Sequence, residues 1–369
     1  MKNTLTLAKV GLLALSGATL SATTVYTNPV GYMTATINAD DSGNGRFSAV
    51  GFPLLNPIVA AGVVESNTAS SITDSSLTWA PSTLLNDLDP QESMYYMTIK
   101  SGPNEGRNLD IVSVSGSTIV LDSNEVDTYA GPDATYEVRS YRTLGDVFGS
   151  DDSSISLKPG NVNEGDLVYL VTGGAIEVFH YLPYSETIVI PGFPPEIVEA
   201  GWRKSSDSLS ELYNDKILPS NEGILVLKRD ANPVDVVAVG DVKVGRATKD
   251  VSTSFSIHTY DFPVDTTIDD LGLYEDGITG FKPGVPGVGD LLYLVSGDGA
   301  IETYYYLEYS ETIVIPGFPP EIIEAGWRKS TDSNLDNLYS DTLVSPGDAF
   351  LVYRQPSEGS FEWSADQPF

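Results

Sequence analysis

Short runs of apolar residues, many of them β-branched or aromatic, recur along the chain and are separated by Gly, Asn, Asp and Pro. Runs of this kind between turn residues are typical of β-strands. Four of them follow one another closely, at Tyr95–Lys100, Leu109–Val114, Thr118–Leu121 and Tyr136–Tyr141. They predict a small antiparallel meander within an N-terminal β domain, either a sandwich or a small barrel.

One segment of the chain occurs twice with a single difference. Tyr184–Ser205 reads YSETIVIPGFPPEIVEAGWRKS, and Tyr309–Ser330 is identical except that Ile323 replaces Val198. The sequences on either side also align, with more differences. A repeat of this length indicates that one structural unit has been duplicated. The chain is therefore expected to contain two tandem copies of one unit.

Each copy has the same expected order of elements. Thr143 and Asp146, repeated as Thr267 and Asp270, fit a capping pattern for one short helix. A hairpin follows whose second strand is rich in aromatic residues, and a further strand closes the unit. The predicted fold is all-β, with an N-terminal β-sandwich or small barrel followed by two tandem copies of a β-rich unit with a short helix.

The repeated segment itself is expected to contain a helical turn. Pro194 and Pro195 suit the start of such a turn, because proline is tolerated at the first helical position. Glu196 and Glu199 lie near that start, where the helix dipole favours acids. Gly201 then fits the position that ends the turn.

The ends of the chain and the region between the copies complete the organisation. The N-terminus carries two lysines and a short apolar run, which is the pattern of a secretory signal peptide. The region between the copies contains short apolar runs that predict strands, and the polar C-terminal tail gives no strand pattern. The expected parts are a signal peptide (1–22), the N-terminal β domain (23–141), repeat unit 1 (142–230), connecting strands (231–265), repeat unit 2 (266–355) and a C-terminal tail (356–369).

Composition narrows the possible partners and the cellular location. Asp and Glu number 51 and Lys and Arg number 20, which gives a formal net charge of −31. A field of that sign repels nucleic acid and anionic lipid. The chain has no Cys, so packing and strand pairing rather than disulfides must hold it. After the signal, no apolar run is long enough to span a membrane. We therefore expect a secreted protein, extracellular or at the cell surface, with no nucleic acid partner and no membrane insertion.

The residues that most often carry catalysis do not form a recognisable set. His180 lies in the aromatic strand, where the second copy has Tyr305, and His258 lies apart in the connecting region. Neither has the paired spacing of a metal motif. Acids recur in both copies, but a function must be argued from a site, and none can be assembled from them. The sequence therefore predicts that the protein is not an enzyme and has no catalytic residues.

A calcium-loop pattern occurs near the N-terminus. Asp40, Ser42 and Asn44 alternate as calcium ligands do, and Gly45 stands at the sharp turn. Gly51 occupies the twelfth position, where the pattern needs an acid. An ordinary turn rich in Asp and Asn accounts for the same residues and is favoured. No cofactor is therefore predicted, and calcium is the one candidate metal.

Aromatic and proline residues of the two copies are the candidates for assembly or ligand contact. Exposed aromatics can stack on sugar rings or anchor a partner, whereas aromatics buried between sheets only build the core, and burial is the favoured alternative. The candidate contact residues are Tyr184, Pro191, Phe193, Pro194, Trp202, Tyr309, Pro316, Phe318, Pro319 and Trp327.

Several motifs together resemble a known group of proteins. They are the segment YTNPVGY at Tyr26–Tyr32, SGPNEGR with LDIVSV after it, RTLGDVFG and the two GWR motifs. In these motifs the chain is similar to an uncharacterised family of secreted β-rich proteins from Verrucomicrobia-like bacteria. The resemblance covers nearly all of the chain after the signal. It implies export and a β-rich repeated body, and it implies no activity and no functional residues.

These observations favour a non-enzymatic secreted structural protein of a bacterial extracellular fibre or surface layer. Two similar units in one chain suit head-to-tail self-association, and strand addition at an open sheet edge is a suitable mode of contact. The alternative is a carbohydrate-binding or adhesive surface module that uses exposed aromatics. In that alternative Trp202, Trp327 and the strand tyrosines would stack on a glycan.

Overall fold

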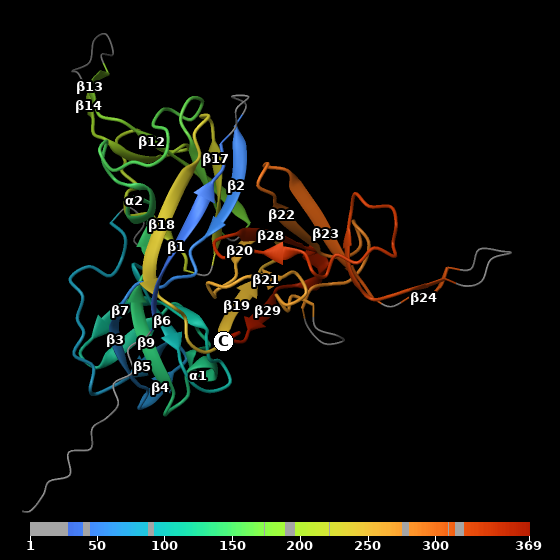
Figure 1. Cartoon of the computed structure of the whole chain (residues 1–369). Helices are drawn as coiled ribbons and strands as arrows, with labels where there is room; N and C mark the ends of the chain where they lie inside the picture. The colour runs from blue at the N-terminus through green and yellow to red at the C-terminus, as the bar shows by residue number, and fades with distance from the viewer. Residues whose placement is uncertain are drawn as a thin grey trace, which may run out of the picture.

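The computed structural model describes residues 29–39, 45–87, 92–172, 174–188, 196–220, 222–274, 280–308, 310–313 and 321–369. Over these residues the protein is all-β, as predicted, with antiparallel sheets and two short α-helices. Figure 1 shows a meander at the lower left and two bodies that are each built on a five-stranded sheet.

The two five-stranded sheets have the same strand order, and segments of matching sequence occupy matching places. The first sheet contains, in spatial order, β15 (Gly201–Lys204), β12 (Ala175–Leu182), β11 (Leu167–Thr172), β17 (Gly223–Lys228) and β2 (Arg46–Gly51). The second contains β26 (Gly326–Lys329), β23 (Ile301–Leu307), β22 (Leu291–Val295), β28 (Ala349–Arg354) and β20 (Ser254–Thr259). The predicted hairpins are therefore present as β11–β12 and β22–β23.

The last strand of each sheet comes from outside the predicted units. β2 lies in the predicted N-terminal domain and β20 in the predicted connecting region, yet they pair with β17 and β28. Two more strand pairs extend the bodies in the same way. They are β1 (Val30–Ile37) with β18 (Val234–Asp241), and β19 (Ala247–Val251) with β29 (Phe361–Ala365). The folded bodies are thus larger than the boundaries drawn from the sequence.

The C-terminal tail, in which no strand was predicted, contains β29. Phe361 and Trp363 alternate with exposed Glu362 and are buried in the core of the second body. A strand of five residues with polar side chains at every second position leaves too short an apolar pattern to detect from sequence. Its pairing with β19 over Ala247–Val251 supplies the backbone hydrogen bonds that hold it in place.

The meander lies in the chain between β2 and the first body's remaining strands. Its seven strands, in spatial order, are β3 (Ile58–Val63), β9 (Thr135–Ser140), β6 (Tyr95–Ile99), β7 (Asn108–Ser115), β8 (Thr118–Leu121), β5 (Ser71–Thr73) and β4 (Ser66–Thr68). The four predicted strands are confirmed as β6 to β9. Helix α1 (Val126–Tyr129) contributes Val126 to a separate apolar core with Ile72, Met97 and Ile111, all fully buried. The meander therefore folds around its own core.

The two copies differ at the predicted short helix. In the first copy, Thr143 and Asp146 form a capping box at the start of α2 (Leu144–Phe148). In the second copy the hydroxyl of Thr267 accepts the same bond from the backbone of Asp270 at 3.1 Å, but a turn replaces the helix. Gly272, with φ of +67°, ends that turn one position earlier than the glycine after α2.

Two small strand pairs accompany these turns. They are β10 (Arg142–Thr143) with β16 (Ile217–Leu218), and β21 (Thr266–Thr267) with β27 (Leu343–Val344). A single 3₁₀ turn, η1 (Pro356–Glu358), precedes β29. The matching position of both pairs shows that the turn regions of the two bodies are held by the same backbone contacts.

In both bodies a buried aspartate comes directly before the first strand of the hairpin. Asp166, just before β11, accepts hydrogen bonds from Lys228 Nζ at 2.9 Å and from the backbone amides of Lys158 and Arg229. Asp290, just before β22, accepts from Arg354 Nη1 at 2.6 Å and from the matching amides. Both aspartate side chains are fully buried. One carboxylate therefore ties three chain segments together in each body.

The two five-stranded sheets pack against each other through a small cluster of apolar residues. Ala49 and Val171 of the first body contact Ile257 and Ala349 of the second. A Cβ atom added to Gly223 would lie 2.3 Å from the Cβ of Ala349, which is closer than real carbon atoms approach. The spacing between the bodies therefore depends on the missing side chain at this glycine.

Replacing Gly223 with valine is expected to lower the free energy of unfolding by about 1–3 kcal/mol, because an overpacked interface forces the sheets to shift. Denaturant unfolding at equilibrium measures this. Gly131→Ala is the control, since nothing lies within 4 Å of the added Cβ there. Equal stability of the two variants would contradict the close packing of the sheets.

Candidate functional site

The repeated segment forms a two-stranded ribbon in each body. β13 (Ser185–Ile188) pairs with β14 (Glu196–Val198), and β24 (Ser310–Ile313) pairs with β25 (Glu321–Ile323). Among the described residues, neither ribbon pairs with a third strand. Figure 1 shows the ribbons projecting from different parts of the molecule, one at the upper left and one at the far right. The same sequence is therefore displayed at two distant places.

Each ribbon leaves backbone groups at its outer edges available for pairing. An edge strand presents unpaired N–H and C=O groups, and an isolated hairpin is only marginally stable in water. The helical turn predicted to begin at Pro194 and Pro195 is wrong for the part that the structure describes, since Glu196–Val198 is strand β14. Pairing with β13 satisfies the backbone groups that a helical turn would have satisfied internally.

Two of the predicted contact residues are core residues. Trp202 is 0% exposed and Trp327 is 1% exposed. The indole N–H of Trp202 donates to the carbonyl oxygen of Gly149 at 2.8 Å, and its ring packs against Tyr181 and Phe148. Neither tryptophan can therefore stack on a glycan, which removes the two main platforms of the carbohydrate-binding alternative.

The other predicted contact and metal residues are only partly described. Tyr184 is 51% exposed just before β13. The remaining candidates lie outside the described residues: Pro191, Phe193, Pro194, Tyr309, Pro316, Phe318, Pro319 and the calcium-loop residues Asp40, Ser42 and Asn44. Within the described ranges, no cluster of three or more His, Asp or Glu side chains is placed to hold a metal ion. Neither helix in these ranges has the length and apolar character to cross a membrane.

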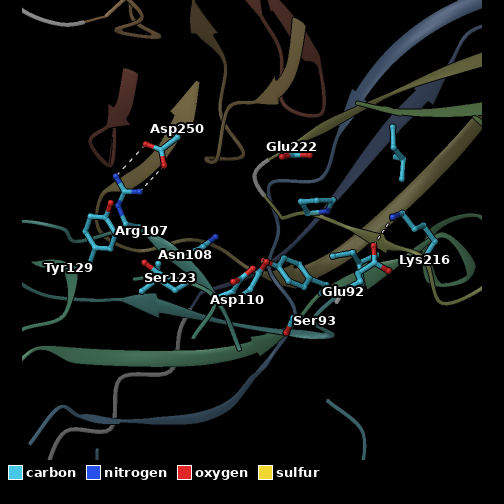
Figure 2. A pocket seen from close by; sticks show the side chains of 16 residues that line it. Glu92, Ser93, Arg107, Asn108, Asp110, Ser123, Tyr129, Lys216, Glu222 and Asp250 are labelled. Carbon is cyan, nitrogen blue, oxygen red and sulfur yellow. Dashed lines mark hydrogen bonds and ion pairs between the residues drawn. The ribbon is translucent and has the colours of Figure 1, made fainter. Parts of the chain in front are cut away.

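A cleft of about 480 Å³, called here the junction cleft, lies where the meander meets both bodies (Figure 2). Its lining residues come from three distant parts of the chain, so no local motif announces it. The charged lining residues are Glu92, Arg107, Asp110, Asp122, Lys216, Glu222 and Asp250. The cleft therefore contains more acids than bases.

The two cations of the junction cleft are engaged in holding the meander to the bodies. Lys216 Nζ lies 2.6 Å from Glu92 of the meander. Arg107, from the meander, lies 2.8 Å from Asp250 and also pairs with Glu362. Because both bases already face acids, the cleft has little to attract an anion. Its chemistry favours neutral or cationic groups instead.

Two carboxyl groups in the junction cleft are shifted toward their protonated forms. Burial raises the pKa of Asp110, although the Tyr141 hydroxyl donates to this carboxylate at 2.5 Å. Burial raises the pKa of Glu222 to about 7, against the opposing effect of the Lys249 charge. Groups with such shifts gather at functional sites, because they can give or take a proton near neutral pH.

The shift of Glu222 predicts a pH-dependent stability. Because its pKa in the folded protein is about 7 and its ordinary value is 4.5, the folded state holds this proton more tightly. The free energy of unfolding should therefore fall as pH rises from 4.5 to 7, by up to about 1.4 kcal/mol per pH unit. Glu222→Gln should lack this slope. The free energy of unfolding is measured in denaturant from pH 4.5 to 8. The same pH slope for the unaltered protein and for Glu222→Gln would contradict the prediction.

Comparison with protein-family models, with curated proteins and with solved structures finds no match for this chain. Its function therefore has to be argued from the ribbons and the junction cleft themselves.

Proposed function

We propose that this protein is a non-enzymatic, secreted structural protein that builds an extracellular fibre or surface layer of a bacterium. The observation that carries this proposal is the pair of projecting ribbons, β13–β14 and β24–β25, which have the same strand sequences except at Val198 and Ile323. Strands β12 and β23 beside them have diverged at several positions although they fill matching places in the sheets. Packing within the bodies does not explain why the ribbon strands have stayed the same while β12 and β23 have diverged.

The reason for the unchanged ribbon sequence is pairing with a second copy of the chain. A ribbon edge on one molecule adds strands to a ribbon edge on the next, which gives backbone hydrogen bonds without a specific pocket. Because each molecule displays two ribbons of the same sequence, each binds two neighbours. Because the two ribbons project from different parts of the molecule (Figure 1), contacts at both of them link one molecule to the next in an open chain. The strongly negative body opposes any other association between copies.

Breaking the ribbons one at a time tests the proposal. Proline at Ile188 or Ile313 removes a backbone donor from β13 or β24 and disrupts the ladder. The unaltered protein should sediment as long assemblies and appear as fibres or sheets in electron micrographs. Either single variant should stop at dimers, because one ribbon remains, and the double variant should be monomeric.

Gly131→Ala serves as the matched control, because its site is open and distant from either ribbon in sequence. It should assemble as the unaltered protein does. Monodisperse monomers of the unaltered chain at high concentration would overturn the proposal, as would assemblies that survive both prolines.

The junction cleft supports a second candidate, the binding of a neutral glycan. Its acids can accept hydrogen bonds from sugar hydroxyl groups, and its engaged cations do not favour anionic ligands. Binding of glycans on an array that Asp110→Asn and Glu222→Gln both abolish would support this candidate. Cleavage of a bound glycan by the unaltered protein would further show that the protein is an enzyme.

A further inference from the structure

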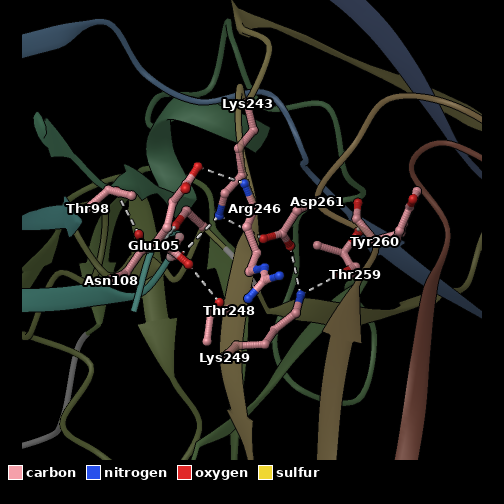
Figure 3. Close-up of polar contacts among 12 residues, drawn as sticks. Thr98, Glu105, Asn108, Lys243, Arg246, Thr248, Lys249, Thr259, Tyr260 and Asp261 are labelled. Carbon is pink, nitrogen blue, oxygen red and sulfur yellow. Dashed lines mark hydrogen bonds and ion pairs between the residues drawn. The ribbon is translucent and has the colours of Figure 1, made fainter. Parts of the chain in front are cut away.

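Three charged side chains are buried together between β19, the end of β20 and the meander (Figure 3). The Asp261 carboxylate lies 2.7 Å from Lys249 Nζ through Oδ1 and 3.0 Å from Lys243 Nζ through Oδ2. The exposed fractions of Lys243, Lys249 and Asp261 are 4%, 6% and 5%. The ring of Trp363 lies 4.4 Å from Lys249 Nζ. An amine and a carboxyl group are thus held in contact away from water.

The fold itself does not require this contact. From the register of the matching strand pairs, Ala35 and Pro53 occupy the places in the first body that Lys249 and Asp261 occupy in the second. The first body forms the same strand pairs without either charge. The lysine–aspartate pair is therefore an addition that only one body carries.

We propose that Lys249 and Asp261 become joined by an isopeptide bond between the Lys249 side-chain nitrogen and the Asp261 side-chain carbonyl carbon. A proton first passes from the ammonium to the carboxylate, which leaves a neutral amine beside a neutral acid. The nitrogen then attacks Cγ of Asp261, the C–N bond forms, and the C–Oδ1 bond breaks. The departing hydroxyl leaves as one water molecule with a proton from the nitrogen. No oxidant, reductant or further reactant is needed.

Lys243 assists the reaction. The Lys243 ammonium, 3.0 Å from Oδ2, stabilises the negative charge that develops on this oxygen during attack.

The geometry also explains why the bond would persist. Contact at 2.7 Å converts a reaction between two molecules into one within a fixed pair, which raises its rate greatly. Burial excludes the water that would otherwise hydrolyse the amide. The bond would fix β19 to the segment after β20 in a chain that has no Cys to form a disulfide.

Mass spectrometry of the purified chain tests the proposal directly. The intact protein should be lighter than its sequence by one water. After denaturation and chymotryptic cleavage at Phe255, which lies between the two residues, the fragments containing Lys249 and Asp261 should remain joined. Lys249→Arg keeps a positive charge but lacks the amine that forms the bond. This variant should have the full mass of its sequence and should release two separate fragments.

The pair Lys228 and Asp166 is the internal control. This pair is equally buried, and its charged atoms lie 2.9 Å apart. The second body has an arginine in place of the lysine, so a positive charge is enough at this position. No link should form there, and Lys228→Arg should leave the mass deficit unchanged. Full mass of the unaltered protein, with two separate fragments after cleavage at Phe255, would overturn the proposal. A link at Lys243 instead would also overturn it.

Discussion

Replacement of Trp202 with alanine is expected to lower the free energy of unfolding by about 3–5 kcal/mol. The side chain is fully buried, its N–H bonds to the carbonyl of Gly149, and its ring packs against Phe148 and Tyr181. Removing it leaves a large cavity and an unpaired carbonyl in the first body. Equilibrium unfolding in denaturant, followed by tryptophan fluorescence and by circular dichroism, measures the change.

Trp327→Ala gives a matched test in the second body, since this ring is 1% exposed and packs against Phe281 and Tyr306. A loss of similar size is expected. Tyr184→Ala, at a half-exposed position, should change stability little and serves as the control. If Trp202→Ala kept full stability and lost only a binding partner, Trp202 would be a contact residue and the burial described above would be wrong.

Replacement of Asp290 with alanine is expected to lower the free energy of unfolding by about 3–5 kcal/mol, because the buried Arg354 then has lost its charged partner. The change also leaves the backbone amides of Lys282 and Gln355 without their acceptor. The loss of stability arises because the Arg354 charge stays buried without an ionic partner, and not because the ion pair itself is strong. Thermal or denaturant unfolding measures it.

Asp166→Ala should cost less in the first body, because Lys228 keeps Asp230 as a second ionic partner at 2.7 Å. Lys228→Arg is the matched control, because the second body already uses an arginine in this place, and it should change stability by less than about 1 kcal/mol. A small effect of Asp290→Ala together with a large effect of Lys228→Arg would contradict the role assigned to these aspartates.

The strands that pair with close neighbours in the chain were predictable from sequence. β6 to β9 and the hairpins β11–β12 and β22–β23 have short connections and strong apolar runs, so local pattern and turn residues suffice. β2 and β20 were not placed correctly, because their partners are β17 and β28 and no local pattern reports a pairing over such distances. The sheets therefore include strands from outside the predicted repeat units, whereas the fold class was predicted correctly.

The candidate sites show the same limit. The duplicated segment is evident from sequence. Its second strand is not, because Pro194, Pro195 and the acids after them also suit the start of a helix. The junction cleft was missed, because Arg107, Lys216 and Asp250 approach one another only in the folded chain. Asp261 likewise meets Lys249 through tertiary packing, and aspartates are too abundant in this chain for one to stand out.

The position of the meander has a kinetic consequence. Because it lies between β2 and the strands that complete the first sheet, β1 and β2 leave the ribosome long before β17 and β18. The second body has no such interruption, and contacts between segments nearer in the chain form faster. We expect the meander to fold first, the second body to close promptly once it is complete, and the first body to stay open until its late strands arrive. Exposed early strands of this kind are vulnerable to wrong pairing, so the order in which the strands are synthesised makes the first body the slower and more error-prone of the two.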